Sequence, residues 1–295
     1  MAVIRSDDVE TAVGGAARVD EPFHIGSNTK AMTATLAAIA VERGLLDWTS
    51  SAADVLDVDG STEITLERLL AHTAAIRPLT DDAELIGLPQ ERAEVARLLV
   101  SEPPLFEPGA DNVYSNGGYT VAAAMLEAVT GTTWESLLEG WLAQPLSITY
   151  DTGWPPGLVG HYERDGDLIP HDRADGYLVH AAIAPAGDVS ATIGAYGRFV
   201  QLHLRGLRGQ PELIAVESFE RLHTPVRGGF ALGWGVQPWE GARTSVHAGS
   251  AGTFFAIVAL QPERDLAVAV MTNAGGQRAE AASIAAAREL IAMHA

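Results

Sequence analysis

The pattern of apolar positions changes once along the chain, near residue 227. Before that point, apolar residues recur at helical spacing in segments separated by loops rich in proline and glycine. After it, short runs rich in valine, phenylalanine or alanine predict strands, and a helical pattern closes the chain. Helices are expected at 27–43, 66–72, 91–101, 119–130, 134–141, 193–205 and 277–293, and the late strands at 230–238, 243–247, 253–260 and 266–272.

The first 25 residues alternate loosely and contain Gly14-Gly15, which predicts a two-stranded hairpin and a turn into the first helix. Strands at both ends of the chain predict one antiparallel sheet assembled from both termini. We therefore expect an α+β protein. Residues 1–52 and 215–295 would form the sheet region and 53–214 a mostly helical insertion, with the active site at their interface.

Composition narrows the possible partners and compartments. The 295 residues carry a formal net charge of -19, which argues against binding nucleic acid or an anionic membrane. The absence of cysteine excludes disulfides, thiolate zinc sites and a cysteine nucleophile. The longest apolar run, 31–41, is too short to span a bilayer, and no leader is visible. The chain as it stands is expected in the cytoplasm, or in the periplasm or outside the cell if a leader was removed.

Lys30 is the only lysine of the chain, and it lies three residues after Ser27. On a helix this spacing places the two side chains on one face, about 5–6 Å apart at Cβ. A serine hydroxyl needs a base to become a nucleophile, and a desolvated lysine can lose its proton whereas arginine cannot. The apolar run after Lys30 predicts such desolvation. The alternative is a leftover surface lysine.

Two further short motifs carry candidate chemistry. In Tyr114-Ser115-Asn116 the phenol could act as a general base, and the amide could bind a substrate carbonyl or hold the lysine. The alternative is a simple turn into the following helix. In His247-Ala248-Gly249, at the end of a predicted strand, glycine would let a substrate backbone approach the strand edge. A lone histidine, however, is more often structural.

Together, Ser-x-x-Lys, Tyr-x-Asn and His-x-Gly resemble the motifs of serine β-lactamases and penicillin-binding proteins, in their class C-like branch. That branch includes β-lactamases, DD-carboxypeptidases, D-aminopeptidases and carboxylesterases. The resemblance implies a β-lactamase-like fold. The supporting stretches occur in the family's order and span nearly the whole chain: 23–30, 69–73, 106–109, 232–235 and 271–273.

The resemblance also implies catalytic roles. Ser27 would be the nucleophile and Lys30 its proton partner. Tyr114 would be the general base that also delivers a proton to the leaving group, and His247 an electrostatic or proton-relay group beside it. Which of Lys30 and Tyr114 holds the proton at rest is a coupled titration that stays open.

For substrate binding, the resemblance implies that Asn116 holds the acyl side. The backbone N–H groups of Ser27 and Ser250 would form the oxyanion hole, and Gly249 and Ser250 would line the strand edge. Trp234, between two glycines at a sheet edge, is expected in the pocket.

The departures from the family pattern bear on the substrate. Class C β-lactamases have lysine at the position of His247, and peptidases of the branch often have threonine at that of Ala248. Both groups help to hold an anionic substrate, and the negative charge of the chain adds repulsion. We therefore expect a carboxylesterase or D-aminopeptidase-like amidase that acts on a small neutral acyl group. The alternatives are a β-lactamase or DD-carboxypeptidase, a penicillin sensor without turnover, and a non-catalytic scaffold.

A metal site is the remaining possibility. His161, His171 and His180 lie close together in a stretch rich in aspartate and glycine, which is expected to be a polar loop. Their spacing matches no standard zinc pattern. We expect no metal or other cofactor, a small ester, amide or β-lactam as the binding partner, and no particular oligomeric state.

Overall fold

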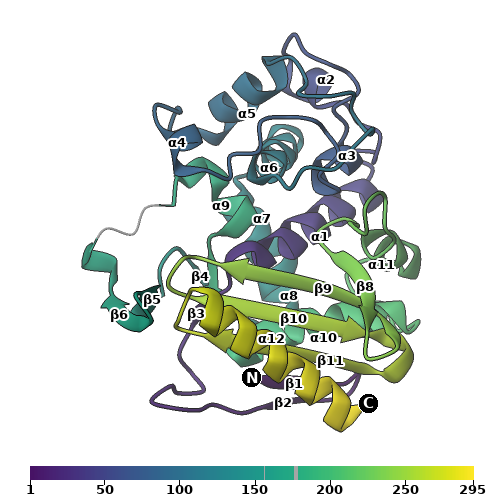
Figure 1. Cartoon of the computed structure of the whole chain (residues 1–295). Helices are drawn as coiled ribbons and strands as arrows, with labels where there is room; N and C mark the ends of the chain where they lie inside the picture. Colours follow the sequence, from purple (N-terminus) through teal and green to yellow (C-terminus); the bar gives the residue numbers. More distant parts are fainter. Residues whose placement is uncertain (156, 176–178) are drawn as a thin grey trace.

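The computed structural model describes residues 1–155, 157–175 and 179–295. Its main feature is a six-stranded antiparallel sheet in the order β2-β1-β11-β10-β9-β8 (Figure 1). The N-terminal strand β1 pairs with β11 near the C-terminus, with Ala2 opposite Ala269. The α+β fold and the single sheet built from both termini are thus confirmed. The strands are β1 Ala2–Ile4, β2 Val9–Thr11, β8 Gly235–Trp239, β9 Ala242–Ser250, β10 Phe255–Gln261 and β11 Leu266–Thr272.

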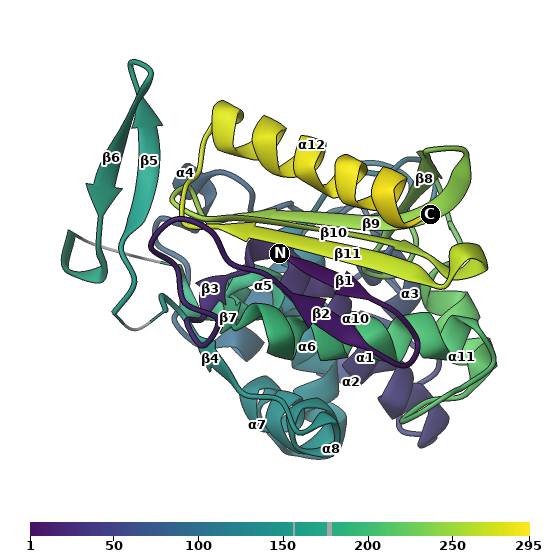
Figure 2. The same cartoon turned by 90° about the horizontal axis from the view of Figure 1, so that it is seen from below.

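Both faces of the sheet are covered, which explains the continuous apolar runs of its central strands. Helix α12 (Gln277–His294) packs on one face, and α10 (Ile193–Leu207) and α1 (Thr29–Glu42) lie on the other (Figure 2). Successive residues of β10 alternate between the two: Phe255 and Ile257 join the cluster under α12, whereas Ala256 and Val258 join the larger core. All seven residues of β10 are buried.

Helix α1 is the centre of the larger core. Its residues from Thr29 to Ala40 are all buried, as expected for a helix that is surrounded on every side. It contacts α6, α9 and α11. The remaining helices are α2 Ala52–Leu56, α3 Leu66–Leu70, α4 Asp82–Leu85, α5 Arg92–Ser101, α6 Asn116–Thr130, α7 Trp134–Leu137, α8 Gln144–Leu146, α9 Ala184–Gly187 and α11 Val216–Leu222. A π-helix, η2 Leu138–Ala143, joins α7 to α8, and the 3-10 turns are η1 Gly26–Asn28, η3 Arg173–Asp175, η4 Ala181–Ile183 and η5 Pro262–Arg264.

The middle of the chain, predicted to be mostly helical, also contains short strands that were not predicted. A small sheet joins β3 (Phe23–His24), β7 (Val189–Ala191) and β4 (Tyr150–Thr152). The expected polar loop around the histidines is instead a hairpin of β5 (Gly160–Arg164) and β6 (Asp167–His171), which projects from the body (Figures 1 and 2). The division of the chain into 1–52 with 215–295 and 53–214 stays a prediction.

Two features are absent from the described residues: a cluster of metal ligands and a helix able to cross a membrane. No group of three or more histidine, cysteine, aspartate or glutamate side chains that could hold a metal ion occurs in this part of the chain. None of the described helices has the length and apolarity that crossing a bilayer requires.

Candidate active site

Ser27 lies in the 3-10 turn η1, immediately before α1, so the helix begins at Thr29 and not at Ser27 as predicted. The turn continues into the helix, and the i, i+3 relation to Lys30 is kept. The Lys30 Nζ lies 3.2 Å from Ser27 Oγ. Gly26 permits this arrangement because its φ of +53° favours glycine, and a Cβ there would lie 2.7 Å from the backbone nitrogen of Ser250.

Lys30 is completely buried, and burial lowers its pKa well below 10.5. Its Nζ donates to Asn116 Oδ1 and to the Ala186 carbonyl, both at 2.7 Å. No carboxylate among the described residues is bonded to it. A neutral amine has two N–H groups and one lone pair, so the two carbonyl acceptors use both hydrogens and leave the lone pair for the Ser27 hydroxyl. Burial and contacts together favour a neutral Lys30 that can accept the Ser27 proton.

Tyr114 completes the cluster from the helical side. Its side chain lies beside that of Ser27, and the Lys30 Nζ lies 4.6 Å from the centre of its ring. Burial raises the Tyr114 pKa to about 12, although the interaction with Ser27 opposes the shift. The phenol therefore keeps its proton at neutral pH. The structure thus brings together the three side chains that the sequence pattern singled out.

Asn116 reaches Lys30 because α6 begins three residues earlier than predicted. The side chain of Ser115 caps the helix by accepting a hydrogen bond from the Gly118 N–H at 2.9 Å. Gly117 lies against the Arg77 carbonyl, which would be 2.4 Å from a Cβ at that position. The Asn116 amide donates to the Leu79 carbonyl at 2.9 Å while its oxygen accepts from Lys30. In this structure it holds the lysine, one of its two expected roles.

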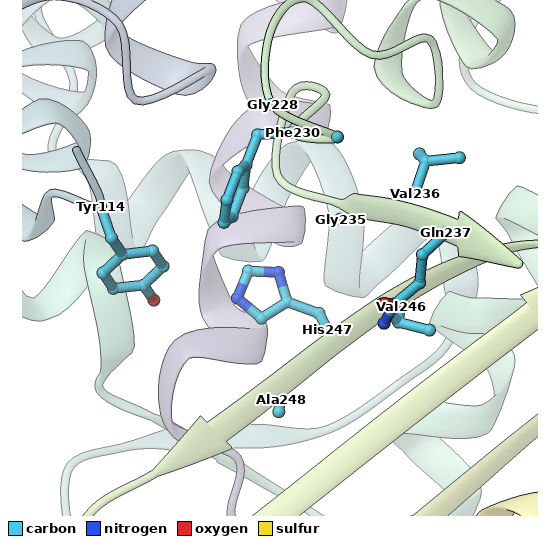
Figure 3. A pocket seen from close by; sticks show the side chains of 10 residues that line it. Tyr114, Gly228, Phe230, Gly235, Val236, Gln237, Val246, His247 and Ala248 are labelled. Carbon is cyan, nitrogen blue, oxygen red and sulfur yellow. The ribbon is translucent and has the colours of Figure 1, made fainter. Parts of the chain in front are cut away.

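His247 faces Tyr114 across the site, with one ring nitrogen directed at the phenol (Figure 3). Its Nδ1 donates to the Gly233 carbonyl at 2.7 Å, because a carbonyl can only accept. Burial, and then the proximity of Lys30, lower the His247 pKa to about 4. At neutral pH the ring is therefore uncharged, and its Nε2 is an acceptor. It does not supply a fixed positive charge.

The end of β9 lies directly against η1, and this close contact is possible because a glycine lies on each side of it. A Cβ on Gly249 would lie 2.1 Å from the Ile25 carbonyl oxygen and 2.6 Å from the Ser27 nitrogen. The reciprocal approach of Gly26 to Ser250 brings the backbone N–H groups of Ser27 and Ser250 into neighbouring positions. These two donors are a candidate oxyanion hole.

Trp234 does not line the pocket, and this prediction is wrong. Its side chain is 1% exposed and stacks on His223, with ring centres 4.7 Å apart. The cause is Gly233, which has a φ of +84° and packs on α1, where a Cβ would lie 2.9 Å from the Ala31 Cα. The turn directs Trp234 into the core, and β8 begins only at Gly235 and not at residue 230 as predicted. Phe230, which sequence analysis did not select, takes the place in the pocket.

The pocket beside Tyr114 and His247 has a volume of about 310 Å³ (Figure 3). Its far wall is formed by β8 and β9, with valine side chains and the amide of Gln237. None of the described residues that line it is charged. They are Tyr114, Gly228, Gly229, Phe230, Gly235, Val236, Gln237, Val246, His247 and Ala248.

Four buried histidines should make the protein sensitive to acid. Burial lowers the pKa values of His72 and His223 well below 6.5, that of His203 to about 3 and that of His247 to about 4. Below pH 6.5 the unfolded chain binds protons that the folded protein does not, so the free energy of unfolding falls as pH falls. Each histidine contributes up to about 1.4 kcal/mol per pH unit between 6.5 and its folded pKa.

We therefore expect urea unfolding to show a steep loss of stability from pH 6.5 to about pH 4. The variant His203→Asn should show a shallower slope because one titrating group is removed. A free energy of unfolding that stays constant between pH 7 and pH 5 would be incompatible with neutral buried histidines.

The fold and the Ser-Lys-Tyr geometry together define the protein as a serine hydrolase. The family model described as Beta-lactamase matches residues 1–293, so the chain belongs to the beta-lactamase family. The expected family resemblance is thereby confirmed.

Similar proteins include penicillin-binding proteins and hydrolases. Penicillin-binding protein 4 of Amycolatopsis lactamdurans is 25% identical over 92% of this chain and 77% of its own length. An unguisins hydrolase of Aspergillus violaceofuscus is 22% identical over 85% of this chain, which spans 52% of that relative. Among solved structures, a D-stereospecific amidohydrolase from a Streptomyces species has a TM-score of 0.74 and 20% identity, covering 92% of this chain and 88% of its own. The octameric penicillin-binding protein homologue from Pyrococcus abyssi has a TM-score of 0.78 and 21% identity, covering 94% and 69%.

Proposed function

We propose that this protein hydrolyses esters or amides with a small neutral acyl group through an acyl-enzyme on Ser27. The observation that carries the proposal is the environment of Lys30. Its Nζ is buried, no carboxylate of residues 1–155, 157–175 and 179–295 is bonded to it, and it lies 3.2 Å from the Ser27 Oγ. A neutral amine in this position is a base for the serine hydroxyl.

In the acylation step, Ser27 Oγ attacks the substrate carbonyl while Lys30 takes the hydroxyl proton. The backbone N–H groups of Ser27 and Ser250 stabilise the negative oxygen of the tetrahedral intermediate. Tyr114, a neutral phenol with a pKa of about 12, gives its proton to the leaving alcohol or amine as the bond to the acyl carbon breaks. The products are the acyl-enzyme, a protonated Lys30 and a Tyr114 phenolate, so the charge is balanced.

Deacylation uses the same groups in reverse. Water attacks the acyl carbon while the Tyr114 phenolate takes its proton, and Lys30 returns a proton to Ser27 Oγ as the acyl group leaves. Both residues regain their initial states without an external proton. The neutral His247 beside Tyr114 offers an acceptor for the attacking water.

The preference for neutral substrates rests on the pocket. It contains a neutral His247 and an Ala248, and its described lining carries no cation that could hold a carboxylate. The net charge of -19 also disfavours anions. The second candidate function is that of a β-lactamase or DD-carboxypeptidase, and it is supported by the similarity to penicillin-binding protein 4 over 92% of this chain.

A substrate panel distinguishes the two candidates. We expect turnover of short p-nitrophenyl esters and slow turnover of nitrocefin, which carries a carboxylate. Because Ala248 lines the pocket, Ala248→Thr should raise activity on the carboxylate-bearing substrate and leave that on the neutral ester nearly unchanged. Rapid hydrolysis of nitrocefin by the unmodified protein would reject the neutral-substrate preference, and a permanent penicillin adduct would indicate a sensor.

A further inference from the structure

His72 lies in an unusual backbone conformation next to the site. The helix predicted at 66–72 would end at this residue, but α3 ends at Leu70 and His72 follows in a turn with a φ of +63°. A positive φ is uncommon for a residue other than glycine and costs free energy unless surrounding contacts hold it. The side chain is 3% exposed, so these contacts are internal.

Three contacts connect His72 to the segment that carries Tyr114. The Val113 N–H donates to the His72 carbonyl at 2.9 Å. The Ser115 N–H donates to the His72 Nδ1 at 3.0 Å. Between them, the rings of His72 and Tyr114 lie 4.5 Å apart with their planes inclined by 34°. His72 thus holds the residue before Tyr114, the residue after it and the phenol ring itself.

The contacts also determine the tautomer and the protonation of the His72 imidazole. Nδ1 accepts a hydrogen bond from a backbone N–H, so in the neutral ring the hydrogen is on Nε2. A protonated ring would lose this acceptor. Burial, and then the nearby Lys30 and His247, lower the His72 pKa well below 6.5, which keeps the acceptor available. The His72 ring also packs edge-on against Phe230, with ring centres 5.3 Å apart.

We propose that His72 is a positioning residue that holds the Tyr114 phenol at Ser27 for proton transfer to the leaving group, an inference that rests on the proposed function. Tyr114 precedes α6 and has no helical hydrogen bonds of its own to fix it. A shift of about 1 Å in a catalytic group can cost roughly 100-fold in rate. The contacts of His72 with residues 113–115 are therefore expected to affect the rate of catalysis.

The test uses an ethyl ester, whose leaving group needs a proton, and two variants. His72→Asn keeps an acceptor and tolerates a positive φ but lacks the ring, whereas His72→Phe keeps a ring but lacks the acceptor. We expect His72→Asn to lower kcat/KM for the ethyl ester by about 10- to 100-fold. In the Tyr114→Phe background the same substitution should cause no further loss, because there is no phenol left to position. The control His203→Asn also replaces a buried neutral histidine and should leave kcat/KM nearly unchanged.

The outcomes separate this inference from the proposed function. An equal loss in the Tyr114 and Tyr114→Phe backgrounds would show a general structural role and overturn the inference, as would no loss in either. If His72→Asn does not fold, His72→Phe allows the same comparison of backgrounds, with the same expected dependence on Tyr114. Failure of the unmodified protein to acylate Ser27 would instead overturn the proposed function.

Discussion

Replacing Lys30 by methionine is expected to lower kcat/KM for ester hydrolysis by about 10²- to 10⁴-fold, the usual contribution of a general base. Methionine fills a similar volume but cannot take the Ser27 proton. Lys30→Arg should be equally inactive although it keeps a positive charge, because a guanidinium does not lose its proton in a protein. The measurement is steady-state hydrolysis of a p-nitrophenyl ester by folded variants.

The control for Lys30 is a partly buried basic residue outside the site. Arg92 is paired with Glu127 and Glu135 and lies away from the pocket. Arg92→Lys should therefore change stability more than activity. Near-normal hydrolysis by Lys30→Met would remove the base from the mechanism and leave Tyr114 as the group that activates Ser27.

Tyr114→Phe should have an effect that depends on the leaving group. An ethoxide must be protonated as it leaves, so loss of the phenol should cost about 10²- to 10⁴-fold in kcat/KM. A p-nitrophenolate leaves without a proton, and the cost there should be less than about tenfold because Lys30 still activates Ser27. The two esters are compared with the same acyl group.

Tyr119→Phe is the matched control for Tyr114→Phe. Tyr119 is also buried and its ring centre lies 5.4 Å from the Lys30 Nζ, but its hydroxyl donates to the Leu70 carbonyl at 2.7 Å. The change in kcat/KM caused by Tyr119→Phe should be the same for both leaving groups. Equal losses for both esters in Tyr114→Phe would contradict the role of Tyr114 as the acid and would favour its action on Ser27 itself.

The parts of the fold that were predictable are those set by local pattern. The apolar run of β11 and the periodicity of α12 are long, and their bounds were predicted to within one residue. The strands β3 and β7 have two and three residues, and they pair Phe23 with Ala191 across most of the chain. Such short segments have no period of their own. The β5–β6 hairpin did carry a signal, the turn Asp165-Gly166, which was missed.

In the candidate site, too, some residues could be placed from local sequence and others only from the tertiary structure. Ser27 and Lys30 are neighbours because of helical spacing, and local sequence is enough to place them together. Trp234 was misplaced because Gly233 reverses the chain, which no periodicity reveals. His72 could not be assigned because its partners, at 113–115, are brought to it only by tertiary structure.

The most direct test of the account is whether residue 27 becomes covalently modified. Intact-mass measurement and peptide mapping after treatment with a fluorophosphonate should show one adduct per chain, located on Ser27, and none in Ser27→Ala. An unmodified protein after prolonged treatment, or an adduct that persists in Ser27→Ala, would contradict the account.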